Sequence, residues 1–182
     1  MSAQHQSATS LMVELSLPFE IEVLSELPAD QLLNQWNIHN EKTLHAINVM
    51  EDVLPIDSDL HHTSPDTARL EIKLDLLTNL LGRMLAQNAQ FPEAQTVQLS
   101  RQQIEASAFD QYIVGDVLKI ELYPSFDYPL PLTLVANIAV TENDNASLVA
   151  EFLSMGDSVV DALEKYIFRH HRRAIALLRH SN

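Results

Sequence analysis

The residues best suited to bind an anion lie near the end of the chain. Residues 162–182 contain one acidic residue, Glu164, against Lys165 and four arginines at positions 169, 172, 173 and 179. A guanidinium group forms paired hydrogen bonds with phosphate or carboxylate, so this stretch could hold a phosphorylated ligand. The alternative is that cations in the second half of a helix only interact favourably with the helix dipole.

The rest of the chain has the opposite charge. The formal net charge is −14, and residues 1–161 alone hold 24 acidic and 6 basic residues, a charge of −18. An acidic body of this kind repels nucleic acid and anionic membranes at long range. Five cations on one segment also give no extended footprint for nucleic acid, so we expect no nucleic-acid partner.

The sequence lacks the common motifs for catalysis and metal binding. It has no cysteine and only three glycines, which excludes thiol catalysis, Cys-based zinc sites and Gly-rich phosphate loops. The eight histidines include two adjacent pairs, His61-His62 and His170-His171, and adjacent residues of a helix do not face the same way. No Gly-x-Ser-x-Gly element surrounds a serine. We therefore expect no metal, no cofactor and no enzymatic activity.

The composition also predicts where in the cell the protein is located. Residues 1–10 are small and polar and contain no basic residue, so we expect a disordered N-terminus and not a signal peptide. The apolar stretches are much shorter than the roughly 20 residues that a membrane-spanning helix needs. Together with the lack of cysteine, these features predict a soluble, cytoplasmic protein without membrane insertion.

A repeat of two residues indicates β-strands. In residues 11–24, Phe19, Ile21 and Val23 alternate with glutamates, and further alternating segments lie between about 96 and 153. Turn-forming residues separate them, including the pair Gly115-Asp116. Short strands with hairpin-length connections favour a closed antiparallel barrel, because closure leaves no free edge.

Helical patterns interrupt and follow these strands. Pro28 could begin a short helix through Trp36, and Asn40 is a plausible N-cap for a second helix to about Leu54. A final helix begins at about Asp157. We therefore predict an α+β chain with one domain over 11–182: a barrel from about 11–24 plus 96–153, a helical insertion at about 28–90, and a C-terminal helix.

The strongest helical signal starts at Ser64, a good N-cap followed by proline at the first helical position. Apolar residues then repeat with the spacing 4, 3, 4, 3 of a coiled coil: Leu70, Leu74, Leu77, Leu81 and Met84. Ile72, Leu76, Leu80 and Leu85 lie outside that seam. One seam could face the chain's own domain while another meets a second chain, or all of them could pack within one protomer. We predict self-association as a dimer or tetramer.

Two runs of this sequence resemble the atypical PilZ domain, a bacterial family linked to cyclic di-GMP signalling. ARLEIKLDLLTNLLGRML at 68–85 is similar to the family's long helix, and YIFRHHRRAIA at 166–176 is similar to its C-terminal part. The strands between them, with Gly115 opening a strand and Val149–Phe152 closing the barrel, are similar to PilZ as well. The likeness covers roughly residues 11–180. It implies a small antiparallel six-stranded PilZ-like β-barrel with an inserted helical pair and a C-terminal helix, in a protein that acts near motility, attachment or virulence control.

The resemblance also locates the expected ligand motifs. Ligand-binding PilZ domains hold the dinucleotide with Arg-x-x-x-Arg ahead of the barrel and Asp/Asn-x-Ser-x-x-Gly on an early strand. This chain has no arginine before Arg69, and the second motif would align with residues 98–103. There Ser100 remains, whereas Gln98 replaces the acid or amide and Gln103 replaces the glycine. The resemblance therefore implies a degenerate motif.

A different ligand site would use other residues. Arg101 could meet Arg169, Arg172 and Arg173 if the last helix packs across the mouth of the barrel. The alternative is that these arginines neutralise the acidic surface of the barrel or of a neighbouring subunit.

Two functions follow as hypotheses. The first is a non-enzymatic PilZ-type regulatory or adaptor protein in cyclic di-GMP signalling, which oligomerises through its heptad helix and contacts an unknown regulatory protein. Cyclic di-GMP is then a possible ligand. The second is a structural oligomerisation scaffold that acts only by protein–protein contacts and has no nucleotide ligand.

Overall fold

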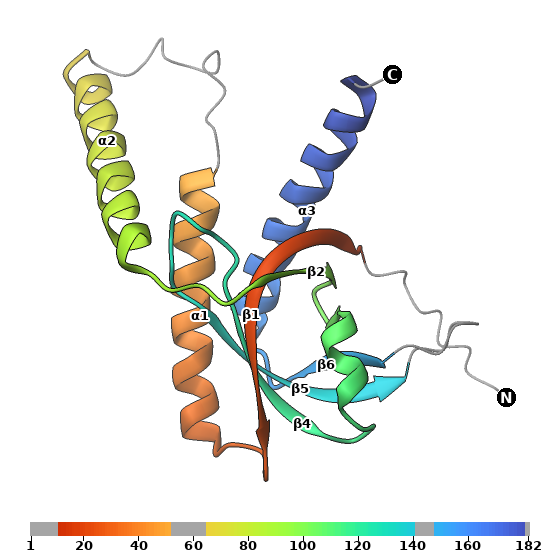
Figure 1. The fold of residues 1–182 in the computed structure, drawn as a ribbon. Coiled ribbons are helices and arrows are strands. Elements are labelled where there is room, and N and C mark those ends of the chain that lie inside the picture. Colours follow the sequence, from red (N-terminus) through yellow and green to blue (C-terminus); the bar gives the residue numbers. More distant parts are fainter. Residues whose placement is uncertain (1–10, 52–64, 141–147, 181–182) are drawn as a thin grey trace, which may run out of the picture.

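A computed structural model describes residues 11–51, 65–140 and 148–180 (Figure 1). The strands are β1 (Val13–Leu24), β2 (Ala94–Leu99), β3 (Gln103–Glu105), β4 (Val117–Leu122), β5 (Leu132–Val140) and β6 (Leu148–Leu153). The helices are α1 (Asp30–Glu51), α2 (Pro65–Asn88) and α3 (Asp157–His180), with a short 3₁₀ turn, η1 (Ser107–Gln111). The predicted disordered segment 1–10 lies outside the described residues.

The six strands close into an antiparallel barrel in the order β1-β2-β3-β6-β5-β4. Closure depends on β1, which is long enough to pair with two strands. Its first half, from Val13, pairs with β2, and its second half, from Phe19, pairs with β4. The predicted α+β fold with a six-stranded barrel, inserted helices and a C-terminal helix is confirmed. Strand β3 ends at Glu105, and the chain then turns into η1.

Alternation along the strands separates the core from the surface. In β4, Leu118, Ile120 and Leu122 are fully buried inside the barrel. Lys119 points outward between them, and its Nζ lies 3.2 Å from Glu22 and 3.0 Å from Glu121. The period of two in the sequence therefore follows the two faces of the barrel wall.

The first helix differs from the prediction. The two expected helices are one continuous helix, α1, and Asn40 lies in its middle instead of capping an N-terminus. The Asn40 side chain is only 1% exposed. Its Nδ2 donates to the Thr133 carbonyl of β5 at 2.8 Å, and its Oδ1 accepts from the Thr133 amide at 2.8 Å. Asparagine suits both a helix cap and a buried amide pair, which is why the local pattern was misleading. The predicted end at Leu54 lies outside the described residues.

Helix α3 packs against α1 on the outside of the barrel. Leu44 and Ile47 of α1 are buried, as are Leu163 and Ile167 of α3. Tyr166 lies between α3 and the barrel, is fully buried, and donates its hydroxyl to the Pro124 carbonyl at 2.9 Å. Burial is the main reason that the pKa of Tyr166 is raised well above its usual value.

Helix α2 touches the barrel only lightly and leans away from α1 (Figure 1). It begins at Pro65, as predicted. Its closest approach is at Gly82, where an added Cβ would lie 2.9 Å from the Asp127 carbonyl oxygen in the β4–β5 connection. Just beyond α2, Phe91 packs edge-on against Tyr123 and Phe126 of the same connection. A small residue and an aromatic cluster therefore attach α2 to its own domain.

The Asn40 amide pair gives a stability prediction. We expect Asn40→Ala to lower the free energy of unfolding by about 2–4 kcal/mol, because it removes two hydrogen bonds and leaves the part-buried backbone groups of Thr133 without these partners. Chemical denaturation followed by circular dichroism measures this change. Asn34→Ala, at an exposed position of the same helix, is the control and should change stability by less than about 0.5 kcal/mol. Equal effects of the two variants would contradict the role of Asn40.

Candidate functional site

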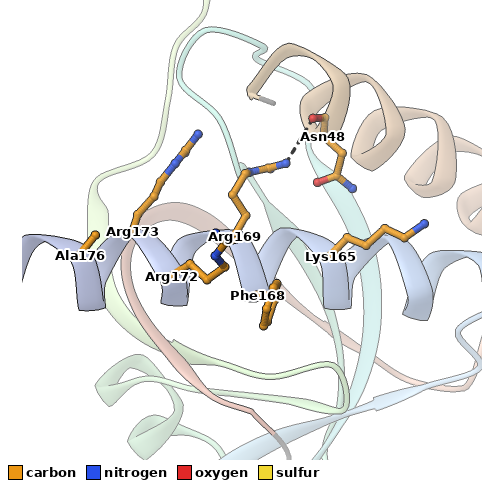
Figure 2. A pocket seen from close by; sticks show the side chains of 7 residues that line it. All are labelled: Asn48, Lys165, Phe168, Arg169, Arg172, Arg173 and Ala176. Carbon is orange, nitrogen blue, oxygen red and sulfur yellow. Dashed lines mark hydrogen bonds between the residues drawn. The ribbon is translucent and has the colours of Figure 1, made fainter. Parts of the chain in front are cut away.

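A cavity of about 470 Å³ lies where α3 passes the end of α1 (Figure 2). Its lining residues on α3 recur every three or four positions, so they share one face of the helix. One residue of α1 completes the wall. The residues that line this groove, which we call the α1–α3 groove, are Asn48, Lys165, Phe168, Arg169, Arg172, Arg173 and Ala176.

Two of its arginines are held by the last turn of α1. Arg169 donates from Nη1 to the Asn48 carbonyl at 3.2 Å, as Figure 2 shows, and Arg173 donates from Nη2 to the Glu51 carbonyl at 2.8 Å. These carbonyls belong to the last described turn of α1. The arginines therefore bind α3 to the last described turn of α1.

The carboxylate of Glu51 gathers the same side chains. Its Oε2 lies 2.8 Å from Arg173 Nη1, 3.3 Å from Arg169 Nε and 3.5 Å from His170 Nε2. Partial burial by itself would raise the pKa of the Glu51 carboxyl. The nearby His170 imidazole, the charge of Arg169 and the hydrogen bond from Arg173 more than offset this, so the pKa is lowered. Glu51 is therefore ionised at neutral pH and offsets part of the positive charge.

The remaining cations of the groove face solvent. Arg172 and Lys165 are exposed. The Arg172 guanidinium lies 5.8 Å from the centroid of the Phe168 ring, and Phe168 is itself 52% exposed. The groove thus combines cations that α1 holds in place, cations in contact with water, and an accessible aromatic ring.

The structure places the predicted ligand residues in two locations. Arg169, Arg172 and Arg173 come together in the groove, whereas Arg101 lies outside its lining. Arg101 instead forms an exposed ion pair with Glu164 of α3 at 3.6 Å.

The residues that align with the PilZ ligand motif form a β-hairpin turn. Ser100 is buried, and its hydroxyl accepts from the Gln102 and Gln103 amides at 3.2 and 3.1 Å and donates to the Gln103 carbonyl at 3.3 Å. The Gln98 side chain donates to Glu14 across the sheet at 2.9 Å. Ser100 therefore shapes the β2–β3 connection.

Sequence reasoning missed several groove residues. Lys165 and Phe168 lie on the same helix face as Arg169 and Arg172, so helical spacing alone could have identified them. Asn48 and Glu51 carry no such signal, because their place beside the arginines depends on how α1 crosses α3.

The predicted oligomerisation residues lie on the surface of this protomer. Nine large apolar residues of α2 have exposures between 49% and 67%, namely Leu70, Ile72, Leu74, Leu76, Leu77, Leu80, Leu81, Met84 and Leu85. None of these nine residues belongs to the buried core of the protomer. The alternative that all of them pack within one protomer therefore does not agree with the structure. Across the described ranges, no helix is both long and apolar enough to cross a bilayer.

The Glu51 cluster gives a prediction with a defined pH dependence. We expect Glu51→Gln to lower the free energy of unfolding by about 1–3 kcal/mol at neutral pH, because charged hydrogen bonds to Arg169 and Arg173 are weakened. The folded-state pKa lies below the unfolded one, so the stabilisation is complete above about pH 5 and is lost as pH falls through the folded-state pKa. Denaturation of both proteins from pH 7 to pH 3 measures the difference, which should close at the acid end.

Glu164→Gln is the matched control. Its partner Arg101 is 41% exposed and Glu164 itself 51%, so this variant should differ from the wild type by less than about 1 kcal/mol. A difference for Glu51→Gln that does not change with pH would contradict the ionised cluster.

Comparisons with known proteins agree with this architecture. The model of the atypical PilZ domain, described as a cyclic di-GMP receptor, matches residues 44–180. A solved structure from Xanthomonas campestris is 28% identical, with a TM-score of 0.70, over 93% of this chain and 92% of that one. That protein is described as pathogenic and as a new tetrameric PilZ domain self-assembled through an unusual helical bundle. No curated protein matches. The family match spans well over half of the sequence, including strands β2 to β6 and helices α2 and α3, and the chain belongs to the atypical PilZ domain family.

Proposed function

We propose that this protein is a non-enzymatic PilZ-type regulatory or adaptor protein, which assembles through α2 into a tetramer and acts by contacts with other proteins. The observation that carries the proposal is the exposure of nine large apolar side chains on one helix. Contiguous apolar surface of this kind is rare on a monomer and marks a site of association.

The apolar residues of α2 form two stripes. The first stripe follows the heptad seam and its flank and consists of Leu70, Leu74, Leu77, Leu81, Met84 and Leu85. The second stripe consists of Ile72, Leu76 and Leu80, and it lies roughly 130° around the helix from the first at 3.6 residues per turn. Gly82 lies on the wider arc of the helix that separates the two stripes, and it faces the barrel. Both stripes therefore point away from the protomer's own domain.

Two stripes favour a tetramer over a dimer. A helix that pairs with one partner buries a single seam, whereas each helix of a four-helix bundle contacts two neighbours. A bundle of four α2 helices would bury both stripes and leave the barrels on the outside. The tetrameric helical bundle of the Xanthomonas campestris protein supports this arrangement for a relative of similar length.

The family description as a cyclic di-GMP receptor supports a role in cyclic di-GMP signalling, which we propose takes place in the bacterial cytoplasm. The regulatory protein that it contacts would meet the barrels or the bundle. In this proposal the usual ligand motif is degenerate and does not bind the dinucleotide. Ser100, the residue of the motif that remains, uses its hydroxyl for hydrogen bonds within the hairpin turn.

The alternative is a structural scaffold that assembles in the same way and has no nucleotide ligand. The engagement of Gln98 with Glu14 and of Ser100 with its own turn favours it, because neither side chain is directed to a ligand at the usual site.

Charged substitutions in the stripes test the assembly. We expect Leu74→Asp with Leu81→Asp to lower the mass in solution at least twofold, and Leu76→Asp with Leu80→Asp to do the same. Each buried leucine contributes about 1.5–3 kcal/mol, and an aspartate in its place would be desolvated. Light scattering coupled to size-exclusion chromatography measures the mass.

Gln90→Asp with Gln111→Asp is the matched control. It adds the same charge at exposed polar positions outside both stripes, so the mass should stay as in the wild type. The proposal fails if both leucine pairs can be replaced while the protein stays folded and its mass is unchanged.

A further inference from the structure

We propose that the α1–α3 groove binds a nucleotide, with its phosphates on the arginines and its base against Phe168. This inference rests on the proposed regulatory function and deepens it, because it assigns a ligand class to a site away from the usual PilZ motif. The groove is made by the second half of α3 and the end of α1, whereas the motif residues lie on the β2–β3 hairpin.

The size and charge of the groove suit a small anion. Its volume of about 470 Å³ is in the range of pockets that enclose small ligands. Lys165, Arg169, Arg172 and Arg173 line it, and Glu51 is the carboxylate that contacts two of them. The groove thus carries net positive charge on a chain whose formal charge is −14. Guanidinium groups grouped in this way match the geometry of phosphate oxygens.

An exposed aromatic ring beside these cations narrows the ligand class. Phe168 is half exposed, and Arg172 lies over its ring. In Figure 2, Phe168 lies below α3 as drawn, whereas Arg169 reaches upward toward Asn48 of α1. A flat ring with an adjacent guanidinium is the platform on which nucleobases stack in single-stranded nucleic-acid sites. Inorganic phosphate would use only the cations, whereas a nucleotide would use both features.

Arg169 and Arg173, the two arginines that contact Glu51, differ in how accessible their side chains are to a ligand. The Arg169 side chain is 13% exposed and is held between Glu51 and the Asn48 carbonyl, whereas Arg173 is 45% exposed. Arg173 can therefore turn toward a phosphate while Arg169 keeps its place. That movement would break the bonds between Arg173 and Glu51, the last residue of α1. Ligand binding in the groove would therefore affect the end of α1, which precedes α2 in the chain.

Calorimetric titration of the full chain with cyclic di-GMP, GMP, GTP, ATP and pyrophosphate tests the proposal. We expect saturable binding of at least one nucleotide and at least tenfold weaker binding of pyrophosphate. Arg172→Ala and Phe168→Ala should each weaken nucleotide binding at least tenfold. Arg179→Ala removes an exposed arginine of the same helix, and Phe126→Ala removes a phenylalanine of equal exposure elsewhere. These two controls should bind within twofold of the wild type.

Three outcomes would overturn the proposal. They are the absence of binding by all four nucleotides, nucleotide binding that the groove variants leave unchanged, and pyrophosphate binding as tight as that of the nucleotides. The mass of each variant is measured in parallel. If Arg172→Ala changes the mass and no nucleotide binds, an acidic segment of a second copy occupies the groove instead. Failure of nucleotide binding with an intact tetramer would leave the assembly through α2 standing.

Discussion

Three asparagines on one face of α1 hold this helix to the rest of the molecule through backbone hydrogen bonds. Asn37 bonds the Ser154 carbonyl and the Gly156 amide, Asn40 bonds both backbone groups of Thr133, and Asn48 bonds the Ala162 carbonyl. They contact, in turn, the segment before α3, strand β5 and α3 itself. Since an amide side chain must meet a carbonyl or amide at one distance and angle, these bonds set the position of α1 along the barrel more narrowly than apolar packing would.

Both candidate surfaces depend on that position. With α1 fixed, its last residue, Glu51, lies beside Arg169 and Arg173, and the α1–α3 groove forms along the next turns of α3. The insertion then continues to α2, which meets the barrel through Gly82 and not through its leucines. The small contact at Gly82 leaves the two apolar stripes of α2 available to other chains. The same insertion therefore shapes a charged groove at one end and an apolar surface at the other.

Local sequence pattern predicted the elements well where one physical period dominates. The alternation around Ile120 marked β4, and Pro65 with the heptad leucines marked α2. The pattern failed where one residue type serves two purposes. Asn40 was interpreted as a helix cap. Its amide bonds to β5 could not be predicted, because they depend on a residue 93 positions away in the chain.

The candidate site was predicted in part for a similar reason. Arg169, Arg172 and Arg173 share a helix face, so their grouping follows from spacing alone. Arg101 was expected to join them, but its place depends on where the β2–β3 hairpin meets α3, and there it pairs with Glu164. The positions of Asn48 and Glu51 follow from the crossing of two helices, which no local pattern encodes.

Assembly of this chain through α2 can be tested by the mass of the unmodified protein in solution. Sedimentation velocity of the full chain, from high to low micromolar concentration, measures that mass. We expect a single species of four times the chain mass of 20.5 kDa. A species with the mass of one chain throughout this range would contradict it, and a stable dimer would contradict the use of both apolar stripes.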